Sequence, residues 1–103
     1  AMGTLVDPWQ PGLLRTIDTL VRAATDVGLP VGVCGESAAD PLLAIVLAGL
    51  GVSSVSMAPS AVAAVTDALR AVDESEAQEI AAAALAETSA NAARDAVTDR
   101  VRT

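Results

Sequence analysis

Very few side chains in this 103-residue sequence are suited to catalysis, and the most reactive of them is a single cysteine, Cys34. Histidine, the commonest general base and transition-metal ligand, is absent. A lone thiol cannot form an internal disulfide, but it can exchange protons near neutral pH because its unperturbed pKa is about 8.5. Gly35 and Glu36 follow it directly. The alternative is that Cys34 is a small buried apolar residue, as many single cysteines are.

A predicted strand positions this cysteine. The segment 31–34 is short and mostly apolar, and it is bounded by Pro30 and Gly35. This pattern predicts a buried strand that ends at Cys34. Residues 52–57 predict a second strand. Helical periodicity precedes the first strand over residues 11–27. In barrel enzymes the chemistry lies at the carboxyl ends of parallel strands, and Cys34 has that position.

The segment between the two strands predicts a helix that is apolar on every side. Asp40 and Pro41 supply an N-cap and a first-turn proline, and residues 42–50 run without a charge to Gly51. Such a helix must be buried on more than one face. We therefore expect a sheet beneath it and other protein above it.

A third helix begins at Pro59, which makes the order helix, strand, helix, strand, helix and predicts parallel strands in an α/β fold. In the tail, residues 73–103, Asp73 and Glu76 resemble a capping box. The rest of the tail is rich in alanine, and we expect two peripheral helices there, the last one weak. Two parallel strands leave their edges unpaired, so the pattern indicates part of a larger α/β structure.

Composition excludes some classes of partner. The formal net charge is −7 and all six basic residues are arginines, which argues against nucleic-acid binding. The longest apolar run, residues 42–52, is about half of a membrane span, so we expect no membrane association. We see no secretory signal, and with one cysteine we expect a cytoplasmic protein. Residues 1–4 are interpreted as a cloning remnant or internal start.

Four motifs then occur in a fixed order. Residues 33–41 read VCGESAADP, and they resemble the cysteine loop of the phosphoenolpyruvate–protein phosphotransferases, enzyme I of the bacterial sugar phosphotransferase system. That loop runs Cys-Gly-Glu-Leu/Met-Ala-Gly-Asp. Residues 7–15, 47–52 and 55–60 are similar to the family's Asp-Pro-x-His-Pro, Leu-Gly-Leu-Gly and Phe-Ser-Met-Ser-Pro stretches. The resemblance covers residues 5–72, with departures at Gln10, Ser37 and Ala39.

The resemblance implies a fold and a role for the cysteine. Residues 5–72 would be the terminal βα units of a TIM (β/α)8 barrel that binds phosphoenolpyruvate, incomplete in this chain, and residues 73–103 a helical tail. Cys34 would be the catalytic acid–base residue that exchanges a proton with the methylene carbon of enolpyruvate. Gly35 and Glu36 would contribute to substrate binding.

The resemblance also implies what lies elsewhere. In the family the phosphorylated histidine, the phosphate-binding arginines and the carboxylates that hold Mg²⁺ all precede this stretch, so the chain alone should be inactive. Partners would be phosphoenolpyruvate and pyruvate, a phosphocarrier protein contacted through the upstream part, and a second copy of the enzyme. Two alternatives remain open. One is a fragment of pyruvate phosphate dikinase or phosphoenolpyruvate synthase, and the other is an acidic helical interaction module that associates through the apolar helix at residues 42–50.

Overall fold

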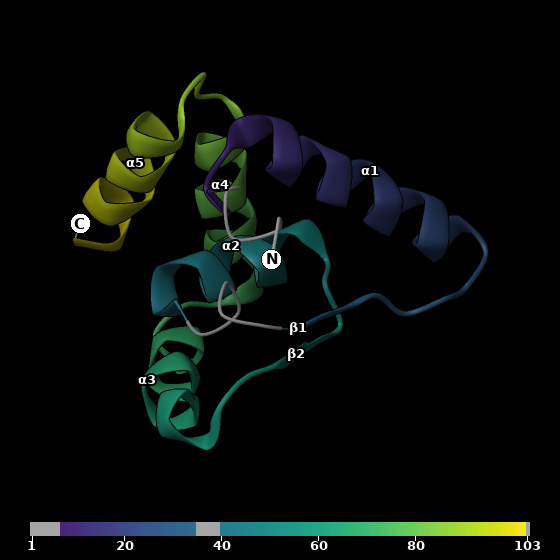
Figure 1. Cartoon of the computed structure of the whole chain (residues 1–103), viewed down its shortest axis with the longest axis horizontal. Helices are drawn as coiled ribbons and strands as arrows, with labels where there is room; N and C mark the ends of the chain where they lie inside the picture. The colour runs from purple at the N-terminus through teal and green to yellow at the C-terminus, as the bar shows by residue number, and fades with distance from the viewer. Residues whose placement is uncertain (1–6, 35–39, 103) are drawn as a thin grey trace.

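Five helices and two strands make up the described part of the chain in a computed structural model that covers residues 7–34 and 40–102. Figure 1 shows the helices grouped around α2 and α4, with the two strands at one side. In chain order the elements are α1 (Pro11–Asp26), β1 (Gly32–Cys34), α2 (Pro41–Leu50), β2 (Ser54–Ser56), α3 (Pro59–Arg70), α4 (Glu74–Leu85) and α5 (Ala90–Arg102).

The two strands are parallel neighbours, as the alternating pattern predicts. In the register of the sheet, Gly32 lies opposite Ser54, Val33 opposite Val55 and Cys34 opposite Ser56. Helix α2 connects the two strands, so β1, α2 and β2 form one βαβ unit. An α/β arrangement with parallel strands is therefore confirmed for the described residues.

Helix α2 is the centre of the core. Its middle residues, Leu43 to Leu47 in the sequence, are each at most 2% exposed. Asp40 caps its first turn, and Gly51 ends it with a left-handed φ of 103°, donating its N–H to the carbonyls of Leu47 and Ala48. A glycine at this position adopts that φ without the steric penalty of a Cβ. The predicted cap, first-turn proline and glycine stop are all confirmed.

The expectation of peripheral tail helices is wrong. Helix α4 packs along α2, and its residues Ala77, Ile80, Ala81 and Ala84 are buried. Helix α5 packs on α4 and also buries small residues against the shared core. The reason is that alanine leaves the backbones free to approach closely, so a thin apolar stripe is enough to bury a helix.

The cover over α2 thus comes from this chain itself, through α3, α4 and α5. The expectation that other protein would cover this helix is therefore wrong for the described residues. Since most of the helix at residues 42–50 is buried within this chain, its apolar surface does not favour the interaction-module alternative.

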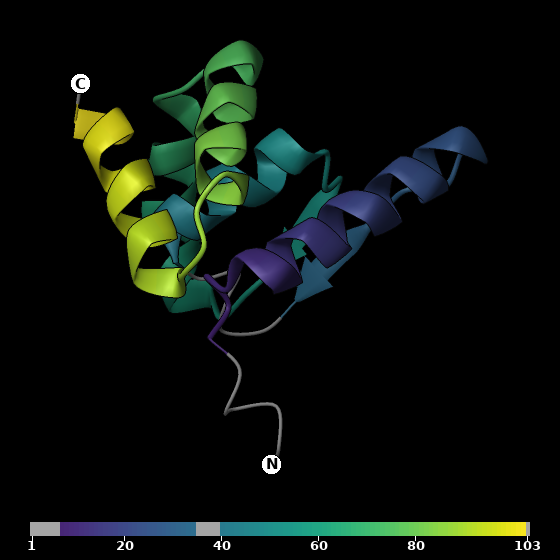
Figure 2. The same cartoon turned by 90° about the horizontal axis from the view of Figure 1, so that it is seen from above.

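The side of the molecule that holds the strands is covered less. Leu20, Val27 and Leu29 lie at the far end of α1 and in the segment leading to β1, and they are 58%, 69% and 63% exposed. Figure 2 shows α1 and the strands extending together away from α4 and α5. Among the described residues no helix is both long and apolar enough to cross a membrane.

The tail crosses α2 closely at Gly49. A Cβ placed there would overlap the carbonyl group of Ala77 and lie 2.9 Å from the Cβ of Ala81. We expect Gly49→Ala to destabilise the fold by about 1–3 kcal/mol, because backbone atoms of α4 would have to move. Urea denaturation measures this difference.

Gly12 is the matched control, because it also lies in a helix and a Cβ there meets nothing within 4 Å. Gly12→Ala should leave the stability unchanged or raise it by up to about 1 kcal/mol through helix propensity. Equal stability changes for the two variants would contradict the close crossing of α4 over α2.

Candidate functional site

The candidate site lies at the carboxyl edge of the two strands. Cys34 is the last residue of β1, and its Cα partner, Ser56, is the last residue of β2. The backbone of Cys34 thus occupies the predicted strand terminus, while its side chain is outside the description. The predicted substrate-binding residues Gly35 and Glu36 also lie outside the described residues.

Asp40 is the first described residue after that segment, and both of its carboxylate oxygens are used. One oxygen accepts the backbone N–H groups of Leu42 at 3.0 Å and Leu43 at 3.4 Å, which caps α2. The other accepts the indole Nε1–H of Trp9 at 3.1 Å. The helix cap confirms the role predicted for Asp40. The indole contact joins residues 31 apart in sequence, so no local spacing signals it.

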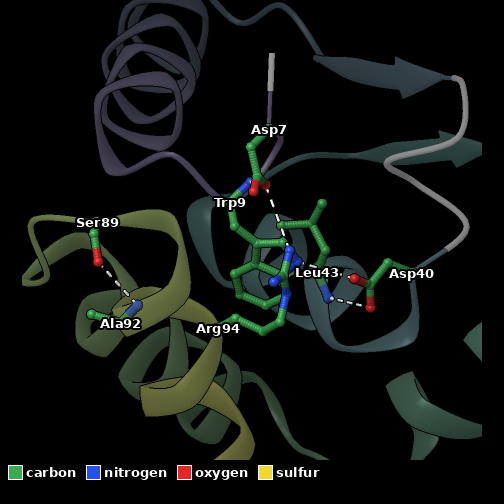
Figure 3. Close-up of polar contacts among 7 residues, drawn as sticks. All are labelled: Asp7, Trp9, Asp40, Leu43, Ser89, Ala92 and Arg94. Atoms are coloured by element: carbon green, nitrogen blue, oxygen red, sulfur yellow. Dashed lines mark hydrogen bonds and ion pairs between the residues drawn. The ribbon is translucent and has the colours of Figure 1, made fainter. Parts of the chain in front are cut away.

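Trp9 brings the tail to this site. It is 1% exposed, although it lies in the short segment before α1. The guanidinium carbon of Arg94, from α5, lies 5.7 Å from the centroid of its ring. Arg94 also pairs with Asp7 at 3.6 Å, and Asp7 accepts the backbone N–H of Trp9 at 2.9 Å. Figure 3 shows the Arg94 side chain against the Trp9 ring and Asp40 at the start of the neighbouring helix.

A second arginine ties α1 to the tail. The polar face of α1 predicts solvated side chains for Arg15 and Arg22. Arg22 is exposed and pairs with Asp18 within the helix, but Arg15 donates to the carbonyls of Leu85 at 2.8 Å and Glu87 at 3.0 Å. Leu85 is the last residue of α4 and Glu87 follows its C-cap, so Arg15 lies at the C-terminal end of the helix, where a cation is favourable.

Over the residues that the structure describes, no group of three or more cysteine, aspartate or glutamate side chains could hold a metal ion. A shallow depression between α4 and α5 is lined by Glu76, Glu79, Ile80, Asp99 and Arg100, none of which adjoins Cys34 in sequence. Among the described residues, the candidate site therefore consists of the strand end at Cys34 and the capped N-terminus of α2.

These features identify the described part of the chain as an α/β protein. Parallel strands joined by a helix, with a cysteine at the carboxyl end of one strand, form the βα arrangement that α/β enzymes use to present reactive groups. The helix that follows the site has a fixed N-terminus, because the Asp40 side chain satisfies its first free N–H groups.

The family follows from sequence comparison. Residues 1–74 match the family described as the PEP-utilising enzyme, PEP-binding domain. Because the match covers most of the chain, this chain belongs to that family. The match ends within the first turn of α4, so α5 lies beyond it.

Curated relatives agree with the predicted resemblance. The phosphoenolpyruvate-protein phosphotransferase of Streptomyces coelicolor is 47% identical over 96 residues, which is 93% of this chain and 17% of the relative. The protein of the same name from Haloferax volcanii is 42% identical over 75% of this chain and 14% of its own. The multiphosphoryl transfer protein of Rhodobacter capsulatus is 44% identical over 82% of this chain and 10% of its own. The chain thus spans less than a fifth of each of these relatives.

Asp40 should matter more to stability than an ordinary N-cap. Asp40→Ala removes the cap of α2 and leaves the buried Trp9 N–H without its acceptor, so we expect a loss of about 2–3 kcal/mol. Asp73 caps α4 by accepting the backbone N–H of Glu76 at 2.8 Å. Asp73→Ala should therefore lower the free energy of unfolding by about 1 kcal/mol. Chemical denaturation of both variants compares them, and equal losses would contradict the shared role of Asp40.

Proposed function

We propose that this chain provides the last βα units of the phosphoenolpyruvate-binding barrel of a phosphoenolpyruvate–protein phosphotransferase, with Cys34 as the proton donor to the product. The observation that carries the proposal is the coincidence of two findings. Residues 1–74 match the PEP-binding domain family, and within that stretch the only cysteine ends a parallel strand.

The chemistry assigned to Cys34 is protonation at carbon. When the phosphoryl group leaves phosphoenolpyruvate for a histidine upstream of this chain, the remaining fragment is the enolate of pyruvate. The S–H bond of the cysteine breaks, a C–H bond forms at the methylene carbon, and the thiolate later regains a proton from water. A thiol suits this step because at neutral pH it is mostly protonated yet acidic enough to release the proton. Gly35 and Glu36 would contact the substrate.

The open side of the sheet supports an incomplete barrel. The described sheet has only two strands, and the nearby apolar residues Leu20, Val27 and Leu29 are more than half exposed. Upstream strands of the TIM barrel would pair with the sheet edges and cover these side chains, because unpaired edges and apolar patches favour association. The same features would make the isolated chain self-associate, and the whole enzyme would be a dimer.

The remaining components belong to the upstream part of the enzyme. They are the phosphorylated histidine, the carboxylates that hold Mg²⁺ and the surface that meets the phosphocarrier protein in sugar transport. Charge neutralisation by arginine and metal dominates phosphoryl transfer, so a piece without those groups should not turn over. The cytoplasm is the compartment proposed for the enzyme.

A hybrid enzyme tests the role of Cys34. The aligned part of the Streptomyces coelicolor relative is replaced by this chain, and pyruvate release from phosphoenolpyruvate is followed. The hybrid should be active, and Cys34→Ala should lower pyruvate formation by about 100-fold or more, because general acid catalysis contributes on that order.

Ser53 provides the matched control, since it is exposed and precedes β2 rather than ending it. Ser53→Ala should leave pyruvate formation at the level of the unmodified hybrid. Full turnover by a folded Cys34→Ala hybrid would refute the assignment of the proton donor.

The isolated chain should bind phosphoenolpyruvate negligibly, because the phosphate and metal ligands are upstream. Isothermal titration calorimetry with phosphoenolpyruvate and Mg²⁺ should therefore give no binding heat. Tight binding that depends on Mg²⁺ would show that the chain carries a complete site by itself and would contradict the division proposed here.

A further inference from the structure

The two faces of the small sheet differ in what they present. Val33 and Val55 lie opposite each other, and both are half-buried against the helical core. Gly32, Ser54 and Ser56 alternate with them along the strands, and all three are exposed. Because successive residues of a strand point to opposite faces, these three share the face turned away from the helices, which we call the open face.

The position of the Ser54 hydroxyl supports this assignment directly. A Cβ added to Gly32 would lie 2.8 Å from Ser54 Oγ, so the hydroxyl stands on the side of the sheet to which a side chain at Gly32 would point. Ser56 is two residues further along the same strand and therefore shares this face. It is also the last residue of β2. The strand thus presents two hydroxyl groups on the open face, one of them at its carboxyl end.

In a complete barrel the open face would be the inner one. The helices of a TIM barrel lie outside its strands, and the interior is filled mainly by bulky branched side chains. The open face instead offers a glycine and two serines, which leave space and supply hydroxyl groups. Water reaches both serines in this chain, since both are exposed. Once upstream strands close the barrel, each hydroxyl needs a hydrogen-bond partner there, because a buried polar group without one is costly.

The two hydroxyls would meet different partners because they lie at different depths. A strand rises about 3.3 Å per residue, which puts Ser56 roughly 6–7 Å nearer the carboxyl end than Ser54. Barrel enzymes bind their substrates at that end, whereas deeper positions belong to the packed interior. Ser56 is therefore the hydroxyl that a bound substrate can reach.

We propose that Ser56 is a substrate-binding residue whose hydroxyl donates a hydrogen bond to an oxygen atom of phosphoenolpyruvate. This rests on the proposed function and adds to it a residue from the second strand. A hydroxyl can donate to a carboxylate or phosphate oxygen, and a hydrogen bond to a charged acceptor is stronger than one between neutral groups. Because the bond would form with the bound substrate, its loss should affect binding more than the chemical step.

The kinetics of the hybrid enzyme described above test this assignment. Ser56→Ala should raise the KM for phosphoenolpyruvate about tenfold and leave kcat within about twofold, because a hydrogen bond to a charged group is lost from the bound state. Ser54→Ala removes a hydroxyl from the same strand and face, and it should leave both constants unchanged. Equal KM values for the two variants would overturn the proposal, as would a lower kcat of Ser56→Ala at an unchanged KM.

A second pair of variants separates the hydroxyl from the shape of the side chain. Ser56→Thr keeps the hydroxyl, whereas Ser56→Val carries a methyl group in its place, and both β-branched residues suit a strand. The KM of the threonine variant should be about tenfold lower than that of the valine variant. This comparison also answers the question if the Ser56→Ala hybrid does not fold. Equal KM values within this pair would contradict a role for the hydroxyl.

The isolated chain distinguishes binding from a structural role. Ser56 is exposed there, so Ser56→Ala should leave the midpoint of its urea denaturation unchanged. A clear loss of stability would mean that the hydroxyl serves the fold, and it would overturn the proposal. Failure of the proposed function shows separately, as full turnover by the Cys34→Ala hybrid, and that result leaves the comparison of KM values at Ser56 intact.

Discussion

The burial of one wholly apolar helix is the constraint on which the rest of this structure depends. Helix α2 has no polar face to turn toward water, so most of its surface must be covered by protein. The alanine-rich α4 meets that requirement by lying close along it, at a crossing where Gly49 leaves room for the backbone of Ala77. Helix α5 packs on α4 and completes the cover. A tail of small residues is therefore central to the core.

This packing has a consequence for the site. Because α2 is held in place, its N-terminus is a fixed point, and Asp40 at that point can serve two partners at once. One carboxylate oxygen satisfies the helix and the other satisfies the indole of Trp9. A buried indole N–H without an acceptor would cost stability, so the two functions of Asp40 reinforce each other. The same carboxylate thereby connects the segment before α1 to the start of α2.

The molecule is well packed on one side and open on the other. The helices around α2 form a continuous buried cluster, whereas the two-stranded sheet has exposed apolar neighbours such as Leu29. This asymmetry agrees with a chain that spans less than a fifth of the relatives to which it is similar. It also separates the candidate site from the core: Cys34 ends a strand on the open side, while the buried cluster is formed mainly by the helices.

Local patterns in the sequence were sufficient for the elements and for the position of the cysteine. The proline and glycine boundaries of α2, the cap at Asp40 and the strand that ends at Cys34 all depend on neighbouring residues, so their spacing alone predicts them. Motif order also indicated the family. The contacts of Trp9 with Asp40 and Arg94 were beyond such reasoning, because they join residues 31 and 85 positions apart. Only the tertiary structure decides which distant surfaces meet, and here a stripe of alanines, too weak a signal to predict burial, brought the tail against the core.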